Sequence, residues 1–135
     1  CTIHYQKKKD WDSILSNALF ADGAAAVLVE GECPKQNCFS LEGFYCDIEF
    51  SGSKDMAWRI SDFGFEMILS SYVPDLIQAG IAQLARKALN VAGMQSDEVD
   101  FYAIHPGGKR ILQVIEEMLM IDPQKTNYSH QVLKE

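Results

Sequence analysis

The stretch Phe101–Arg110 constrains the fold of this chain more than any other. An apolar run from Val99 to Ile104 is typical of a buried strand, and it stops at His105. The chain then turns through Pro-Gly-Gly, and from Lys109 onward the apolar residues take the spacing of a helix face. The sequence therefore predicts a strand, a histidine at its tip and a helix directly after it.

The junction after His105 has the features of a ligand site. In α/β folds, ligands meet the protein at the carboxyl ends of strands. A helix start offers free N–H donors and a partial positive charge, to which Lys109 and Arg110 add full charges. An anionic or phosphate-bearing ligand beside a polarising imidazole suits this combination. The alternative, a core histidine before an ordinary turn, stays open on spacing alone.

Composition excludes several classes of protein. The chain has 135 residues, enough for one compact domain with a core, and 47% hydrophobic with 23% charged residues is ordinary for globular proteins. The formal net charge of -7 argues against nucleic acid as a partner. No apolar run approaches the roughly 18 residues of a membrane span. We therefore expect a cytoplasmic protein that binds neither nucleic acid nor membrane.

The cysteines give only a weak metal signal. There are four of them: Cys1, Cys33, Cys38 and Cys46. Cys33 and Cys38 have C-x4-C spacing, but no second close pair accompanies them. We expect reduced thiols and no metal site.

Hydrophobic periodicity predicts a layered α/β domain. The segments Cys38–Phe50 and Ala57–Ser70 alternate in part, as the two strands of a long hairpin do. A helical stripe follows from about Pro74 to Ala92 and ends near Gly93. We expect the hairpin and the predicted strand before His105 to share one sheet, with this helix packed on a face.

Shorter elements surround these. Trp11–Phe20 reads as a short helical or irregular segment, and a turn at Asp22-Gly23 leads into a strand of small and β-branched residues. Asp122-Pro123 has the pattern of a cap for a short turn, and Ser129–Glu135 is predicted to be helical.

Three stretches together carry a family resemblance. They are Ala18–Ala26, which contains Asp-Gly-Ala-Ala-Ala, then Gly64–Ser70 followed by Val73-Pro74, and then Ile104–Gly108, which contains His-Pro-Gly-Gly. In this order and spacing they resemble the C-terminal part of type III polyketide synthases, the chalcone and stilbene synthase family, on the thiolase fold. Trp58 and the Gly-Phe-Glu-Met form resemble bacterial members. The likeness runs from residue 1 to 135, so we expect a piece of that fold truncated at both ends.

The resemblance implies an acyltransferase similar to naringenin-chalcone synthase, with no cofactor and with coenzyme A thioesters as substrates. A cysteine thiolate takes an acyl starter from CoA. Malonyl-CoA then loses carbon dioxide, and its enolate attacks the bound acyl group. A histidine and an asparagine donate hydrogen bonds to the thioester oxygen as negative charge develops there. The resemblance also implies a homodimer.

Carried over by residue, the resemblance makes His105 the catalytic histidine. Phe20 matches a gatekeeper phenylalanine between the CoA tunnel and the initiation cavity. Met67 falls where plant members carry a second gatekeeper phenylalanine, and this departure implies a differently shaped cavity. The loop beside the CoA arm and phosphates corresponds to Gly107, Gly108 and Arg110. Two cavity-lining strand positions correspond to Cys1 and His4.

Two catalytic parts of the family are expected outside this chain. The nucleophilic cysteine lies upstream of Cys1 in the family, and the asparagine follows Glu135, so we expect the isolated chain to be inactive. An alternative is a fatty-acid condensing enzyme similar to β-ketoacyl synthase III, against which the Pro-Gly-Gly turn argues. Another alternative is a non-catalytic thiolase-fold scaffold.

Overall fold

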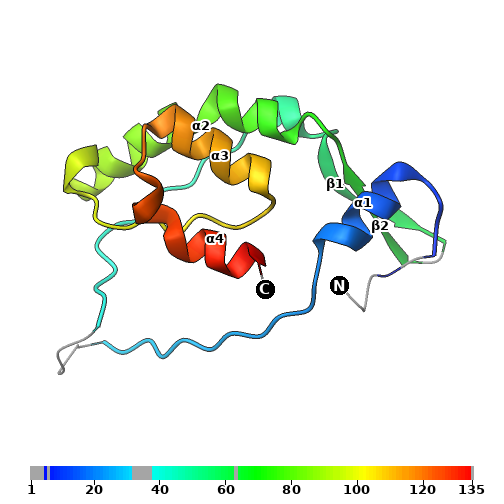
Figure 1. Ribbon diagram of the computed structural model, residues 1–135, viewed down its shortest axis with the longest axis horizontal. Helices are drawn as coiled ribbons and strands as arrows, with labels where there is room; N and C mark the ends of the chain where they lie inside the picture. The colour runs from blue at the N-terminus through cyan, green and yellow to red at the C-terminus, as the bar shows by residue number, and fades with distance from the viewer. Residues whose placement is uncertain (1–4, 6, 32–37, 63, 135) are drawn as a thin grey trace.

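The molecule consists of a helical half and a smaller half that contains a hairpin. The computed structural model describes residues 5, 7–31, 38–62 and 64–134. The main elements are α1 (Trp11–Leu19), β1 (Met56–Ser61), β2 (Gly64–Leu69), α2 (Val73–Ala92), α3 (Lys109–Leu119) and α4 (Asn127–Lys134). Short 3-10 helices lie at Phe50–Gly52, Ser96–Glu98 and Pro123–Thr126. Figure 1 shows α2 along the top, α3 and α4 below its later part, and β1, β2 and α1 beyond its start.

Helix α2 confirms the predicted helix from about Pro74 to Ala92. Pro74 lies in its first turn, where the missing N–H costs nothing because first-turn donors have no intrahelical partner. Gly93 ends the helix in the left-handed region at φ 67°, a conformation that glycine adopts readily. The start and stop signals of the sequence therefore placed this helix correctly.

Helix α3 supplies the core of the helical half. Its buried residues are Leu112, Val114 and Ile115, and Ile121 is buried just after its end. α3 packs against both α2 and α4, so its apolar spacing serves two neighbours. The helix stops at Met120, which has φ 52° although it is not a glycine and whose side chain lies in solvent.

The predicted hairpin exists, but its position was wrong. β1 and β2 pair antiparallel from Met56 opposite Leu69 to Ser61 opposite Gly64, so all of both strands except Met56 lies within the segment predicted as one strand. Gly64 has φ 122°, which lets the chain reverse inside that run. The other predicted strand, Cys38–Phe50, has no strand structure over its length.

The prediction that the strand before His105 joins this sheet is also wrong. Residues 99–104 are extended, but the sheet of the described residues has only the strands β1 and β2. The segment predicted as a strand after Gly23 likewise carries no regular structure. An extended run becomes a strand only when another strand lies beside it, and apolar periodicity does not reveal that neighbour. The layering that the structure does show is α1 packed on β2.

Other local predictions are confirmed. α1 forms, with Asp10 as its N-cap accepting the N–H of Ser13. Asp122 caps the 3-10 helix by accepting the N–H of Gln124 over 2.9 Å. α4 occupies most of the segment predicted to be helical at the end of the chain. Within the described residues, no helix is both long and apolar enough to cross a membrane.

Residues 20–31 and 38–49 run outside the packed elements. Val27 and Phe39 are 85% and 100% exposed, so their apolar side chains lie in solvent. Asp47 accepts hydrogen bonds from Lys87 on α2 and from Tyr45, which lower the pKa of Asp47 to about 2. These contacts attach the second segment to α2.

Two cysteines can be placed. Cys46 is free, as expected, and it is exposed, whereas Cys38 forms a disulfide bond. The prediction of reduced thiols is therefore wrong at Cys38. Cys1 and Cys33 lie outside the described residues.

We predict that Leu112→Ala lowers the free energy of unfolding by about 2–5 kcal/mol, because Leu112 is fully buried between helices and its loss leaves a cavity. The matched control is Val132→Ala on α4, whose 61% exposed side chain should change stability by at most about 0.5 kcal/mol. Urea unfolding followed by circular dichroism measures both. Equal losses in the two variants would contradict a core centred on α3.

Candidate active site

His105 lies at the end of an extended segment, three residues before Gly108, the glycine that caps α3. The N–H of Gly107 donates to the His105 carbonyl over 2.9 Å, so the chain folds back tightly just after the histidine. The residue is exposed, and a ligand can reach its imidazole. The predicted order of histidine, turn and helix is confirmed, although an unpaired extended segment takes the place of the strand.

The two glycines after Pro106 serve different purposes. A Cβ atom at Gly107 would lie 3.4 Å from His105 Cδ2 and 3.3 Å from Ile111 Cδ1, so the imidazole rests close to the Gly107 backbone. Gly108 has φ 145°, which side-chain-bearing residues rarely adopt, and it is the N-cap of α3. Gly107 therefore lies beside the ring with Ile111 as its tightest neighbour, and Gly108 permits the sharp entry into the helix.

Positive charge lies at the start of α3. Lys109 and Arg110 are exposed on its first turn, where the free N–H groups of the helix end also lie. Arg110 Nη1 is 3.7 Å from Glu117 Oε1, and both side chains are more than half exposed, so this ion pair is weak. The side chains of Lys109 and Arg110 are thus available to bind an anion at the start of α3.

Lys125 holds the early part of the extended segment. Its backbone carbonyl accepts the N–H of Tyr102 over 2.8 Å, and its ammonium donates to the carbonyl of Val99. These bonds satisfy backbone groups that a neighbouring strand would otherwise satisfy. The 3-10 helix Pro123–Thr126 therefore acts as the partner of this segment.

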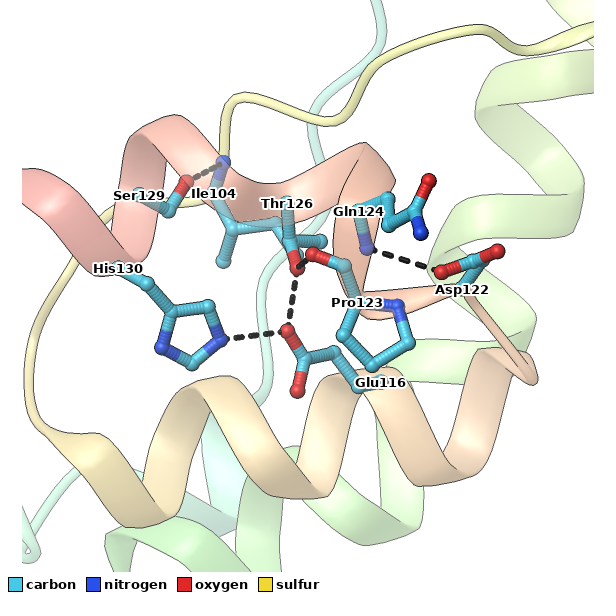
Figure 2. Close-up of polar contacts among 8 residues, drawn as sticks. All are labelled: Ile104, Glu116, Asp122, Pro123, Gln124, Thr126, Ser129 and His130. Carbon is cyan, nitrogen blue, oxygen red and sulfur yellow. Dashed lines mark hydrogen bonds and ion pairs between the residues drawn. The ribbon is translucent and has the colours of Figure 1, made fainter.

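Ser129 holds the part next to the histidine. The N–H of Ile104 donates to the Ser129 hydroxyl oxygen over 3.0 Å, and Figure 2 shows this bond joining the segment to α4. Ser129 is buried, with 5% of its surface exposed. The residue before His105 is thus fixed by a side chain from a helix later in the chain.

The sequence did not predict the roles of Lys125 and Ser129. A lysine whose ammonium and carbonyl both bind one segment has no local pattern. Ser129 left a weak signal, because Thr126, Ser129 and Leu133 recur at helical spacing and place two hydroxyl groups on one face. Small polar residues on the inner face of a helix often bind backbone groups.

The predicted gatekeepers lie in the other half of the molecule. Phe20 directly follows α1, and Met67 lies in β2, against which α1 packs. Met67 also lines a cavity of about 230 Å³ with charged neighbours such as Lys8 and Arg59. His105 precedes α3, so the structure places the histidine and the two gatekeepers in different halves (Figure 1).

The remaining predicted positions are only partly placed. Gly107, Gly108 and Arg110 surround the start of α3, next to His105. Cys1 and His4 lie outside the described residues. Among the residues that the structure describes, no three His, Cys, Asp or Glu side chains group in a way that could hold a metal ion.

Known proteins resemble this chain in sequence. Residues 47–135 match the family described as "Chalcone and stilbene synthases, C-terminal domain". The chain is 30% identical over 122 residues to "Type III polyketide synthase B" of Arabidopsis thaliana, covering 86% of this chain and 31% of that protein. It is 25% identical over 126 residues to "1,3,6,8-tetrahydroxynaphthalene synthase" of Streptomyces peucetius subsp. caesius, covering 88% and 32%. The chain thus spans about a third of the length of these relatives.

Solved structures resemble it in fold. PKS-I from the brown alga Ectocarpus siliculosus has a TM-score of 0.57 at 30% identity, over 62% of this chain and 22% of that one. The 1,3,6,8-tetrahydroxynaphthalene synthase of Streptomyces coelicolor A3(2), a bacterial type III polyketide synthase, has a TM-score of 0.59 at 25% identity, over 66% and 25%. Because the family match covers residues 47–135, well over half of the chain, the chain belongs to the chalcone and stilbene synthase family of type III polyketide synthases and corresponds to its C-terminal portion.

Proposed function

We propose that this chain forms part of a polyketide-forming acyltransferase on a thiolase-like fold. The observation that carries the proposal is His105, which is exposed, backed by Gly107 and placed before a cationic helix start in a chain of this family. In the proposed reaction, malonyl-CoA and an acyl starter from coenzyme A join by decarboxylative Claisen condensation. The proposed reaction needs no cofactor. We propose that the enzyme is cytoplasmic.

His105 has a defined part in that chemistry. The malonyl group loses carbon dioxide, and the electron pair of the broken bond forms an enolate whose negative charge lies on the thioester oxygen. The enolate carbon then attacks the carbonyl of the bound acyl group, and the thiolate that held it leaves. A hydrogen bond from the His105 imidazole to the thioester oxygen stabilises the charge as it develops. The ring can donate only from a fixed position, and the backbone of Gly107 lies beside it.

The start of α3 has a second part in the proposal. In this proposal, the loop beside the CoA arm contains Gly107 and Gly108. Arg110 binds the phosphates of CoA. The free N–H groups of the first turn support this role, because they favour anions. Phe20 and Met67 remain proposed gatekeepers. Cys1 and His4 remain proposed cavity positions.

We predict that His105→Ala lowers the turnover number of the full-length protein by about 10²–10³-fold, since that is the cost of losing one oxyanion donor. His105→Gln should lose less, because the amide NH₂ group of glutamine can still donate a hydrogen bond. The assay follows malonyl-CoA decarboxylation and product formation, with folding checked by circular dichroism. Near-normal turnover in His105→Ala would sink the catalytic role.

Arg110→Ala should mainly raise the Michaelis constant for malonyl-CoA and leave turnover nearly intact, because phosphate binding acts equally on ground and transition states. Glu117→Gln removes only the ion pair with Arg110 and should not raise that constant. Arg86→Ala, an exposed arginine on α2, is the matched control. An unchanged Michaelis constant in Arg110→Ala would rule out the phosphate contact.

We also propose that the protein is a homodimer, and we predict that this chain associates at micromolar concentration. Val27, Phe39 and Phe44 are more than 70% exposed, and apolar surface of this kind favours association. Light scattering should report a dimer or a larger assembly that persists in high salt, because hydrophobic contacts are not screened. A monomer under these conditions is the result that would argue against it.

A further inference from the structure

We infer that Ser129 is a positioning residue for His105, held in place by a polar cluster between α3 and α4. The inference rests on the proposed function, in which His105 must meet a thioester oxygen from a fixed position. Ser129 itself touches neither the substrate nor the imidazole ring in this proposal. It acts through the backbone of Ile104, which directly precedes the histidine.

The bond to Ile104 is well placed for this task. Ser129 is 5% exposed, so water competes little for its hydroxyl oxygen. A part-buried backbone N–H needs an acceptor, and no strand beside residues 99–104 supplies one among the described residues. The hydroxyl therefore sets the path along which the chain enters His105.

The position of Ser129 is fixed in turn by Glu116 on α3. The Glu116 carboxylate accepts a hydrogen bond from the Thr126 hydroxyl, and His130 Nε2 lies 2.7 Å from Glu116 Oε1. Thr126 is fully buried, and its one hydroxyl proton is shared between Glu116 and the Pro123 carbonyl, which lies 3.1 Å from Oγ1. Figure 2 shows the Glu116 carboxylate between the side chains of Thr126 and His130, with Ser129 on the adjoining turn of the chain.

Glu116 thus binds the helical turn on both sides of Ser129. Thr126 lies three residues before the serine and His130 one residue after it. A carboxylate only accepts hydrogen bonds, so the contact with His130 requires a proton on Nε2. A shift of the turn toward or away from α3 would disturb both contacts, because they end on the same carboxylate oxygen.

His105 is therefore held from both directions along the chain. After the histidine, the ring lies beside the backbone of Gly107, Ile111 lies beside the same glycine, and α3 continues from there to Glu116. Before the histidine, Ile104 is bound by Ser129, which the same Glu116 holds in register. One helix consequently determines the backbone position on either side of the catalytic ring.

The test uses the full-length protein with three substitutions of Ser129. Ser129→Ala removes the acceptor, Ser129→Cys keeps the size but offers only a weak acceptor, and Ser129→Thr keeps the hydroxyl. We expect Ala and Cys to lower turnover about 10–100-fold, as for a misplaced catalytic group, with little change in the Michaelis constant for malonyl-CoA. Thr should retain more turnover than Cys, and Gln131→Ala on the exposed face of α4 should match wild type.

Amide hydrogen exchange separates positioning from general loss of structure. In Ser129→Ala, exchange at the Ile104 amide should rise, whereas the Tyr102 amide should stay protected, because its acceptor is the backbone carbonyl of Lys125. A rise at both amides together would mean that the segment unfolds, and the positioning role would be wrong. Wild-type turnover in Ser129→Ala or Ser129→Cys would also overturn it, even if Ser129→Thr fails to fold.

The exchange readout also separates this inference from the proposed function. If wild-type protein forms no product from malonyl-CoA, the proposed function fails. A selective loss of protection at Ile104 would still show that Ser129 fixes the backbone before His105. If product forms and Ile104 exchange does not change in Ser129→Ala, only the positioning inference fails.

Discussion

The burial of one face of α3 is the constraint on which the helical half depends. The buried side chains of this face are Leu112, Val114 and Ile115, and they leave water only if α2 and α4 both cover the helix. Burial of their apolar surface stabilises this arrangement of the three helices. The position of α4 then determines where Ser129 lies, and the start of α3 determines where the turn after His105 lies. Packing of apolar side chains thus fixes the geometry of polar ones.

Local signals in the sequence predicted the helices well. Pro74 and Gly93 mark the ends of α2, and the apolar spacing after Lys109 marks α3. These signals are local, because a helix satisfies its hydrogen bonds within itself. The strands were predicted poorly for the opposite reason. Residues 99–104 have the composition of a strand, yet their bonds go to Lys125 and Ser129, which lie more than twenty residues later.

The candidate site also contains a part that local sequence predicts and a part that depends on distant residues. The order of His105, the two glycines and a helix follows from neighbouring residues, and the sequence predicts it. The roles of Ser129 and Glu116 depend on which side of α4 faces α3. The sequence alone predicts that side only weakly. Phe20 and Met67 were selected by resemblance alone, and the structure places them in the other half of the molecule.

The neighbours of Gly107 have an evolutionary consequence. A Cβ atom at 107 would lie 3.4 Å from Cδ2 of the His105 ring, an ordinary van der Waals distance, and 3.3 Å from Ile111 Cδ1, which is tighter. A side chain at 107 can therefore leave the imidazole in place, but it requires Ile111 to shift by a few tenths of an ångström. Positions 107 and 111 are thus the pair that we expect to vary together, because a smaller residue at 111 makes room for alanine at 107.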